Sequence, residues 1–149
     1  MIVIQSNTDE NFTSIRAIAK EVWPIAYGTI LSQEQLDYMM EMMYSVSSLQ
    51  NQAKEKGHRF ILAIENDIPV GFASYEFNYT KKPKTKVHKI YVLSNQQGKG
   101  IGKTLIDFIL NKAKERHQKA LILNVNKNNI AIRFYESIGF MCKSNMSIW

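Results

Sequence analysis

One stretch, "NQQGKGIGKT" at residues 95–104, constrains the fold more than any other. It follows the apolar run "KIYVL" and precedes the apolar, helix-periodic run "LIDFIL", so it predicts a strand, a glycine-rich turn and a helix. A turn of this kind lets backbone N–H groups converge at the positive end of a helix, where they bind phosphate oxygens. Gln97, Lys99 and Lys103 add side-chain donors. We therefore expect this loop to bind a diphosphate.

Two common phosphate-binding motifs do not fit the loop. A P-loop has four residues between its first glycine and "GK[ST]", whereas only three residues separate Gly98 from the "GKT" at 102–104. The dinucleotide fingerprint G-x-G-x-x-G fails because the third glycine comes too early. Both motifs also follow the first strand of their folds. The sequence therefore argues against both of these nucleotide-binding folds.

Length and composition predict a single domain over residues 1–149. A chain of 149 residues that is 45% hydrophobic can bury one core and is short for two. No run approaches the roughly 18 apolar residues of a membrane span, and the start has no leader-like pattern, so we expect a cytoplasmic protein. The single cysteine, Cys142, cannot form an internal disulfide and is a poor structural metal ligand, so we expect no metal.

Hydrophobic periodicity predicts helices and strands in a mixed order. A first helix is expected over about 9–27, with Thr8 as its N-cap, and a second helix is expected to begin with a capping box at Ser32 and Gln35. Three further helices are expected over about 47–56, from the glycine loop to about 118, and over "NIAIRFYESI". Strands are expected at "IVIQ", "RFILAIE", "PVGFASYEF", "VHKIYVL", "ALILNV" and after Gly139. This order predicts an α/β domain with a mixed sheet, whose central pair of strands is parallel because a crossover helix joins them.

Two segments of the sequence resemble the GNAT superfamily of N-acetyltransferases. "IYVLSNQQGKGIGKTLI" is similar to the acetyl-CoA-binding segment of that family, Q/R-x-x-G-x-G/A, with Gln97, Gly100 and Gly102 at its fixed positions. "LNVNKNNIAIRFYESIGF", residues 123–140, resembles the family's second segment. The resemblance implies a GNAT-like acyl-CoA fold and acetyl-CoA as cosubstrate.

The resemblance also implies which residues bind the coenzyme. Backbone groups of one strand would pair with the pantetheine arm, the glycine loop would hold the pyrophosphate, and one of two asparagines would contact the coenzyme. These residues are Ile90, Tyr91, Val92, Gln97, Gly98, Lys99, Gly100, Ile101, Gly102, Lys103 and either Asn128 or Asn129. Tyr135 matches the tyrosine that protonates the departing thiolate in many family members.

Acetyl transfer to an amine needs a group that removes a proton, because an amine with a pKa of about 10.4 is mostly protonated at neutral pH. Where some family members carry a glutamate, this sequence has Asn124 or Leu123, and neither accepts a proton. The remaining candidates are Glu76, His88 and Glu21, of which Glu76 or His88 acting through water is favoured. Backbone N–H groups near Val92 and Leu93 are expected to stabilise the tetrahedral intermediate.

The acceptor is predicted to be a primary amine, either a small molecule such as a polyamine or a peptide amine. Its pocket is expected to come from the first helices, including Trp23, Tyr27 and the methionines of the second helix, although methionines at this spacing are usually core residues. Two alternatives stay open: a domain that binds acyl-CoA without turnover, and a nucleic-acid-binding module. The second rests on the net charge of +6 and the cluster "KKPKTK", interpreted as a solvated hairpin loop.

We expect the C-terminal strand region to be shorter than the family pattern by about one strand. An early end would leave the edge of the "ALILNV" strand unpaired, and an exposed edge pairs readily with another chain. We therefore expect the residues after Gly139 either to pair with that strand directly or to be exchanged in a homodimer.

Overall fold

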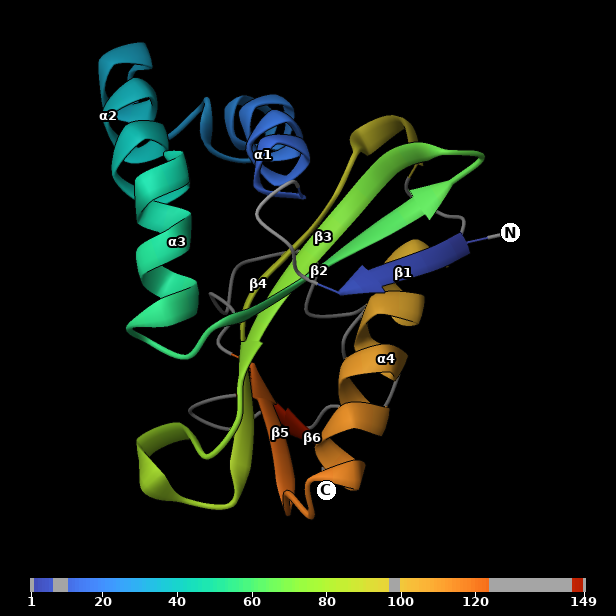
Figure 1. Ribbon diagram of the computed structural model, residues 1–149. Coiled ribbons are helices and arrows are strands. Elements are labelled where there is room, and N and C mark those ends of the chain that lie inside the picture. The colour runs from blue at the N-terminus through green and yellow to red at the C-terminus, as the bar shows by residue number, and fades with distance from the viewer. Residues whose placement is uncertain (1, 7–10, 97–99, 124–145, 149) are drawn as a thin grey trace.

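The computed structural model describes residues 2–6, 11–96, 100–123 and 146–148. These residues form one mixed sheet with helices on both faces (Figure 1). The strands are β1 (Ile2–Ser6), β2 (Arg59–Glu65), β3 (Ile68–Glu76), β4 (Lys84–Val92), β5 (Ala120–Leu123) and β6 (Met146–Ile148). The helices are α1 (Asn11–Tyr27), α2 (Gln33–Tyr44), α3 (Val46–Lys54) and α4 (Ile101–Glu115), with short 3-10 turns at Tyr79–Lys81 and Ser94–Gln96.

The sheet has the strand order β1-β2-β3-β4-β5-β6, and every neighbouring pair is antiparallel except β4 and β5. Helix α4 connects these two strands, which confirms the predicted parallel pair with its crossover helix. The hairpin between β2 and β3 turns at Asn66 and Asp67, with φ of 51° and 64°. Two consecutive positive φ angles give a type I′ turn, which matches the twist of the flanking strands.

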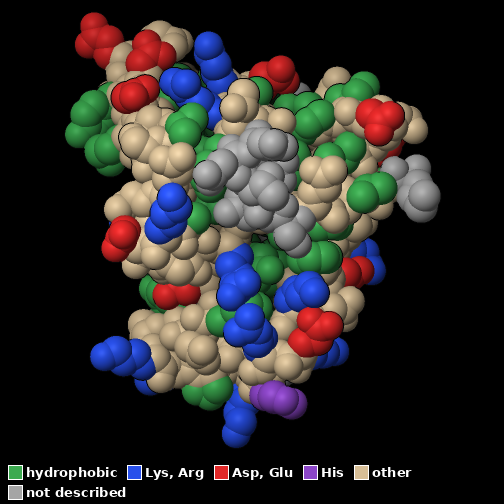
Figure 2. Space-filling model, in the orientation of Figure 1, with side chains coloured by type: hydrophobic (Ala, Val, Ile, Leu, Met, Phe, Trp, Pro, Cys, Tyr) green, Lys and Arg blue, Asp and Glu red, His purple; other side chains and the backbone are tan. Residues whose placement is uncertain are grey.

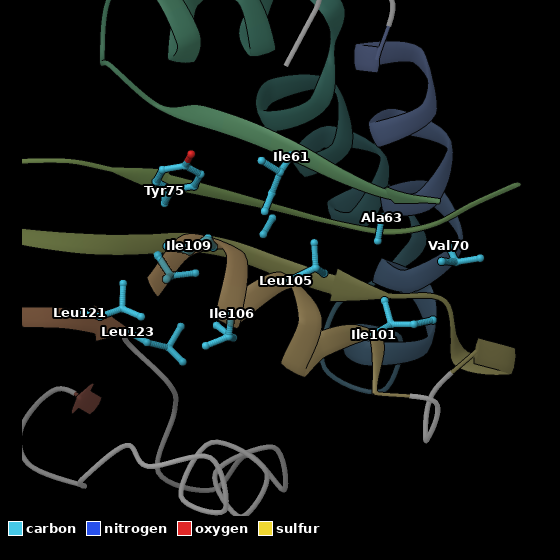
Figure 3. Close-up of a cluster of buried hydrophobic side chains, with 12 residues drawn as sticks. Ile61, Ala63, Val70, Tyr75, Ile101, Leu105, Ile106, Ile109, Leu121 and Leu123 are labelled. Atoms are coloured by element: carbon cyan, nitrogen blue, oxygen red, sulfur yellow. The ribbon is translucent and has the colours of Figure 1, made fainter. Parts of the chain in front are cut away.

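Two apolar clusters hold the layers together, one on each face of the sheet. Residues of α4 such as Leu105 and Ile109 are fully buried against Ile61, Tyr75 and Leu121 of the sheet (Figure 3). On the opposite face, α1 to α3 pack over β2 and β3 through a second cluster. Its largest fully buried side chains are Phe12, Ile15, Tyr44, Leu49, Phe60, Leu62 and Phe72. The sheet therefore separates a three-helix face from the α4 face.

Several predicted element boundaries are confirmed and others are wrong. The capping box of α2 is present, since the Ser32 hydroxyl accepts from the Gln35 N–H and the Gln35 side chain accepts from the Ser32 N–H. Helix α1 continues through Pro24 to Tyr27. The lysine cluster at 81–86 is not only a loop, because Lys84 already belongs to β4.

Strand β4 starts early for two physical reasons. Thr85 is fully buried, and its hydroxyl donates to Gln118 Oε1 at 3.1 Å. In addition, Lys84 and its neighbours pair with β5 from Ala120 onwards. Helix α4 ends at Glu115, before the predicted end near Gln118, because Gln118 turns inward to bond Thr85 and the backbone N–H of Asn78.

Within the described residues, the edge of β5 that faces away from β4 is paired with another strand of the same chain. Strand β6 pairs antiparallel with β5, from Leu121 opposite Ile148 to Leu123 opposite Met146. The direct pairing expected for the residues after Gly139 is thus confirmed for this segment. The homodimer stays a prediction. The predicted helix cap at Thr8, the helix "NIAIRFYESI" and Cys142 lie outside the described residues.

Candidate active site and coenzyme-binding edge

A β-bulge in β4 brings His88 to the three-helix face of the sheet. Ser74 lies opposite Lys89 and Tyr75 lies opposite Val87, so His88 is the extra residue in this ladder. Val87 and Ile90 both contribute to the α4-facing cluster. His88 and Lys89 lie between these two residues in the strand. Their side chains therefore point to the other face, since successive strand side chains alternate and the bulge adds one position.

The bulge places His88 beside Glu76, so the structure brings together the two favoured base candidates. His88 Nε2 lies 2.8 Å from Glu76 Oε1. A third residue, His58, joins them just before β2. Its Nε2 lies 3.8 Å from the same Glu76 oxygen, and its ring stacks on that of His88 with centroids 3.9 Å apart and an interplanar angle of 14°.

Sequence reasoning missed His58, because the register expected from the hairpin turn does not place it next to Glu76. The two-residue turn alone would place His58 opposite Tyr75. A register shift between Ala63 and Ile64 moves the pairing by one residue, so that Arg59 lies opposite Tyr75 and the preceding His58 comes opposite Glu76. Because such a bulge is not encoded in a recognisable pattern here, the contact emerges only from the structure.

Both imidazoles are neutral at physiological pH. Burial and the nearby Lys86, Lys89 and Lys56 ammonium groups lower the pKa of His88 to about 4. Burial lowers the pKa of His58 to about 4 as well, with a further contribution from His88. A neutral His88 that bonds the Glu76 carboxylate must donate its Nε2–H, which leaves the lone pair on Nδ1. Glu76 thereby fixes the tautomer of a potential proton acceptor.

Lysine side chains surround this group. Lys89 is buried, donates to Gln52 Oε1 at 2.5 Å, and has a pKa lowered to about 8, first by burial and then by Lys56. Lys86 donates to the Tyr79 hydroxyl at 3.1 Å, and the Tyr79 ring meets the His88 ring edge-on at 5.8 Å. The surroundings of the Glu76–His88 pair are therefore cationic.

His58, Glu76 and His88 also form a cluster of a kind that can hold a metal ion, with ligand atoms within 4.8 Å of one another. Two features oppose a dication there. A metal bound by imidazole lies close to the ring plane, and two nearly parallel stacked rings do not share such a position. The neighbouring lysines named above add repulsion.

The predicted coenzyme edge of β4 is partly as expected. Strand β5 pairs with β4 only as far as Val87, in the region where both strands are described, and β4 continues to Val92. The Leu93 N–H donates to the Val70 carbonyl at 2.9 Å. Because antiparallel residues alternate, the backbone groups of Ile90 and Val92 then face away from β3, towards the β5 side, while those of Tyr91 face β3. The expectation that the Leu93 N–H serves as an oxyanion donor is wrong, since this group is already bonded.

The described part of the glycine loop has the geometry of a helix N-terminus. Gly100 caps α4 with φ of +78°, and its carbonyl accepts from the Thr104 N–H at 3.0 Å. Ile101 is buried in the α4-facing cluster, so only its backbone can meet a ligand. Lys103 pairs with Asp107 at 2.9 Å on the exposed side of α4. Gly102 is in the first turn.

Several predicted site residues lie outside the described residues, and their roles stay predictions. They are Gln97, Gly98, Lys99, Asn128, Asn129 and Tyr135. Glu21, the third base candidate, lies on the exposed side of α1.

Aromatic side chains predicted for the acceptor pocket form a packed group under α1 and α2. Trp23 donates its indole N–H to the Tyr44 hydroxyl at 3.2 Å, and its ring lies 4.6 Å from that of Tyr27 and 6.4 Å from that of Tyr91. Burial raises the pKa of Tyr44 and of Tyr91. Of the methionines, Met39, Met40 and Met43 pack against the cluster and Met42 is exposed. The usual core role of such methionines is therefore confirmed for three of them.

None of the helices in the described ranges is long and apolar enough to cross a membrane.

Among known structures, the PaiA N-acetyltransferase of Thermoplasma acidophilum in complex with coenzyme A matches 99% of this chain and 96% of its own, with a TM-score of 0.86 and 22% identity. The ribosomal-protein-S18-alanine N-acetyltransferase of Escherichia coli matches with a TM-score of 0.72 and 17% identity over 99% of this chain and 90% of its own. At these identities the likeness shows the fold.

Sequence relatives agree with the fold. The 5-NmdU N-acetyltransferase of Pseudomonas phage PaMx11 is 30% identical over 94% of this chain and 87% of its own length. An uncharacterized N-acetyltransferase of Methanocaldococcus jannaschii is 33% identical, and the L-methionine sulfoximine/L-methionine sulfone acetyltransferase of Salmonella typhimurium is 28% identical, each over 60% of this chain. These two matches span only 42% and 54% of the relatives' lengths. The model of the acetyltransferase (GNAT) family matches residues 12–140, and the chain belongs to this family.

Proposed function

We propose that the protein is an N-acetyltransferase that transfers the acetyl group of acetyl-CoA to a primary amine, by direct attack in a ternary complex. The observation that carries this proposal beyond family membership is the contact between Glu76, at the end of β3, and His88, on the bulge of β4. His88 lies on the same strand as Ile90 and Val92, the edge proposed for the pantetheine arm, and Glu76 ends the neighbouring strand β3. The Glu76–His88 pair would supply the proton acceptor that the sequence lacks at Asn124 or Leu123.

The proposed reaction proceeds as follows. The amine nitrogen attacks the thioester carbonyl carbon, the C–S bond breaks, and the amine proton leaves through His88 Nδ1, directly or through a water. Glu76 stabilises the imidazolium while it carries this proton. With a pKa of about 4, His88 releases the proton to solvent rapidly at neutral pH, so it acts as a relay. Tyr135 is proposed to protonate the departing thiolate, as the family resemblance implies.

We further propose that the acceptor carries few positive charges besides its reacting amine. Lys56, Lys86 and Lys89 act electrostatically on the His88 ring, and Glu76 is the carboxylate that contacts it. A polyamine would bring additional ammonium groups into this cationic surrounding, whereas an α-amino acid or a peptide N-terminus brings a carboxylate or a neutral amide. The Salmonella relative, by its name, acts on amino-acid-like acceptors, which is consistent with the first of these.

A thiol-release assay tests the proposal. Acetyl-CoA is supplied with amino acids, peptides with free N-termini, lysine peptides, polyamines, aminoglycosides and 5-NmdU in separate reactions. We expect turnover with at least one amine, and a higher kcat/KM for zwitterionic or peptide acceptors than for polyamines. Coenzyme binding without thiol release from any acceptor would instead favour the acyl-CoA-binding domain without turnover.

The base assignment has its own variants. His88→Asn and Glu76→Gln are expected to lower kcat by roughly 10²-fold or more, the usual contribution of a positioned base, with little change in coenzyme affinity. His117→Gln is the matched control, because this histidine is exposed in the turn after α4. Unchanged kcat in both base variants would reject the pair as the proton relay without affecting the proposed reaction itself.

A further inference from the structure

A cavity of about 550 Å³ opens between the C-terminal ends of α3 and α4 and the adjoining parts of β2 and β3. Its charged and aromatic lining includes His58, Arg59, Tyr75, Phe77, Lys112 and Arg116. On the face of the molecule seen in Figure 2, Lys and Arg side chains gather below the centre. No step of the proposed acetyl transfer takes place in this cavity, although His58 in its lining also contacts Glu76.

Two arginines from distant parts of the chain meet over one aromatic ring in the cavity. The Arg59 guanidinium carbon lies 5.1 Å from the centroid of the Phe77 ring, and that of Arg116 lies 4.9 Å from it. Arg59 begins β2, whereas Arg116 is the C-cap of α4. Contact with the ring face holds both planar groups in place, so less side-chain freedom is lost when they bind a ligand.

The charge balance of the lining favours an anion. Among the described residues that line the cavity, Glu115 is the one acidic residue, and it is paired with Lys112 at 3.4 Å. Within residues 2–6, 11–96, 100–123 and 146–148, neither Arg59 nor Arg116 has a carboxylate at ion-pair distance. Two guanidinium groups are thus directed to one cavity with no described counter-ion.

We propose that this cavity binds a small molecule with a phosphate monoester group, held by Arg59 and Arg116. The planar donor fork of arginine matches two phosphate oxygens at once. The volume falls within the usual range of small-molecule sites, about 300–1,000 Å³, and leaves room for more than the phosphate. Tyr75 and Phe77 provide an aromatic wall for the remainder of the ligand.

The cavity is separate from the proposed coenzyme site. The glycine loop lies at the N-terminus of α4, whereas Lys112 and Arg116 lie at its C-terminal end. A helix of 15 residues is roughly 22 Å long, so one phosphate group cannot contact both ends.

His58 gives this proposal a direct readout, because it lines the cavity and also contacts Glu76. A bound dianion would favour the protonated form of His58 and raise its pKa from about 4. The chain has only three histidines, so their ring signals can be assigned by NMR with one variant each.

The experiment is a titration of the full chain with inorganic phosphate and, separately, with ribose 5-phosphate, followed through the His58 ring signals at constant ionic strength. We expect a saturable shift with either probe at concentrations up to about 20 mM. The double variant Arg59→Gln, Arg116→Gln should weaken binding roughly tenfold or more. Lys114→Gln, which removes one charge from the exposed side of the same helix end, should leave the affinity unchanged.

Three results would overturn the proposal. The first is the absence of a saturable shift with both probes. The second is an equal loss of affinity in Lys114→Gln, which would indicate general charge attraction. The third is loss of the shift in Gly102→Glu, which would assign the bound phosphate to the glycine loop. None of these readouts depends on acetyl transfer, so they remain interpretable if the proposed function fails.

Discussion

At the scale of single residues, the site depends on two histidines that the fold keeps uncharged. His58 and His88 stack on each other, share one carboxylate oxygen and lie among lysines, and the pKa of each is about 4. Lone pairs on neutral imidazoles are available for proton transfer throughout the physiological range. The same arrangement has a cost in acid, because protonating both stacked rings places two more positive charges beside Lys86 and Lys89.

Acid should therefore destabilise the protein over a definite pH window. The folded-state pKa of both histidines is about 4 and the unfolded value is about 6.5, so the unfolded chain binds more protons between these values. Stability is then highest above pH 6.5 and falls as the pH decreases towards 4, by roughly 2 kcal/mol for each histidine.

Urea unfolding at a series of pH values measures this effect. His58→Gln should flatten the decrease between pH 6.5 and 4, whereas His117→Gln, in an exposed turn, should leave it unchanged. If both variants follow the wild-type curve, His58 is not the source of the acid sensitivity.

At the scale of elements, helices α1 to α4 were predictable apart from their exact ends, and the bulges were not. The Ser32–Gln35 box, the I′ turn at Asn66 and Asp67, and the strand before the glycine loop all follow from local patterns. The register shifts in β2–β3 and β3–β4 depend on packing between distant strands. These two shifts align His58, Glu76 and His88, which is why Glu76 and His88 could be suggested from the sequence but their contact with each other and with His58 could not.

The lysine-rich composition of residues 81–86 also led to a wrong prediction of where β4 begins. The cluster at 81–86 has the composition of a solvated loop, yet Lys84 and Lys86 flank the buried Thr85 in an alternating strand. Long lysine side chains can keep their ammonium groups outside while the backbone pairs with β5. Composition alone therefore underestimates the length of β4.

The capping box at the start of α2 should stabilise the protein measurably. Ser32→Ala removes the acceptor of the Gln35 N–H, a hydrogen bond of 3.2 Å, and should reduce the free energy of unfolding by about 1 kcal/mol. The urea m-value should not change, since the core is untouched. Thr29→Ala, in the exposed turn before α2, is the control. A loss of the same size in both variants would mean that the turn and not the cap is responsible.

At the scale of the whole molecule, the two proposals place separate anion-binding sites at the two ends of α4. The N-terminal end follows the glycine loop proposed for the coenzyme pyrophosphate, and the C-terminal end lines the cavity with Arg59 and Arg116. A net charge of +6 favours both uses, and it also motivated the nucleic-acid alternative. The charge alone does not distinguish a coenzyme, a phosphate monoester and a nucleic acid as ligands. The two proposals rest instead on the local geometry at each end of the helix.

Coenzyme binding at the glycine loop should be visible in the stability of the whole domain. A ligand present at 100 times its dissociation constant stabilises the folded state by about 2.7 kcal/mol, so acetyl-CoA should raise the melting temperature. Gly100→Glu should abolish this increase, because a carboxylate at the N-terminus of α4 repels the pyrophosphate.

Two glycines of matched geometry separate this charge effect from backbone strain. Gly100 and Gly57 have φ of +78° and +70°, and a Cβ added at either one meets nothing within 4 Å. Gly57→Glu therefore imposes comparable strain near the end of α3, and this variant should keep the full increase with acetyl-CoA. Gly100→Ala carries the strain without the charge and should keep most of it. An unchanged increase in Gly100→Glu would place the pyrophosphate elsewhere, whereas an equal loss in Gly57→Glu would show that backbone strain, and not charge at the loop, controls coenzyme binding.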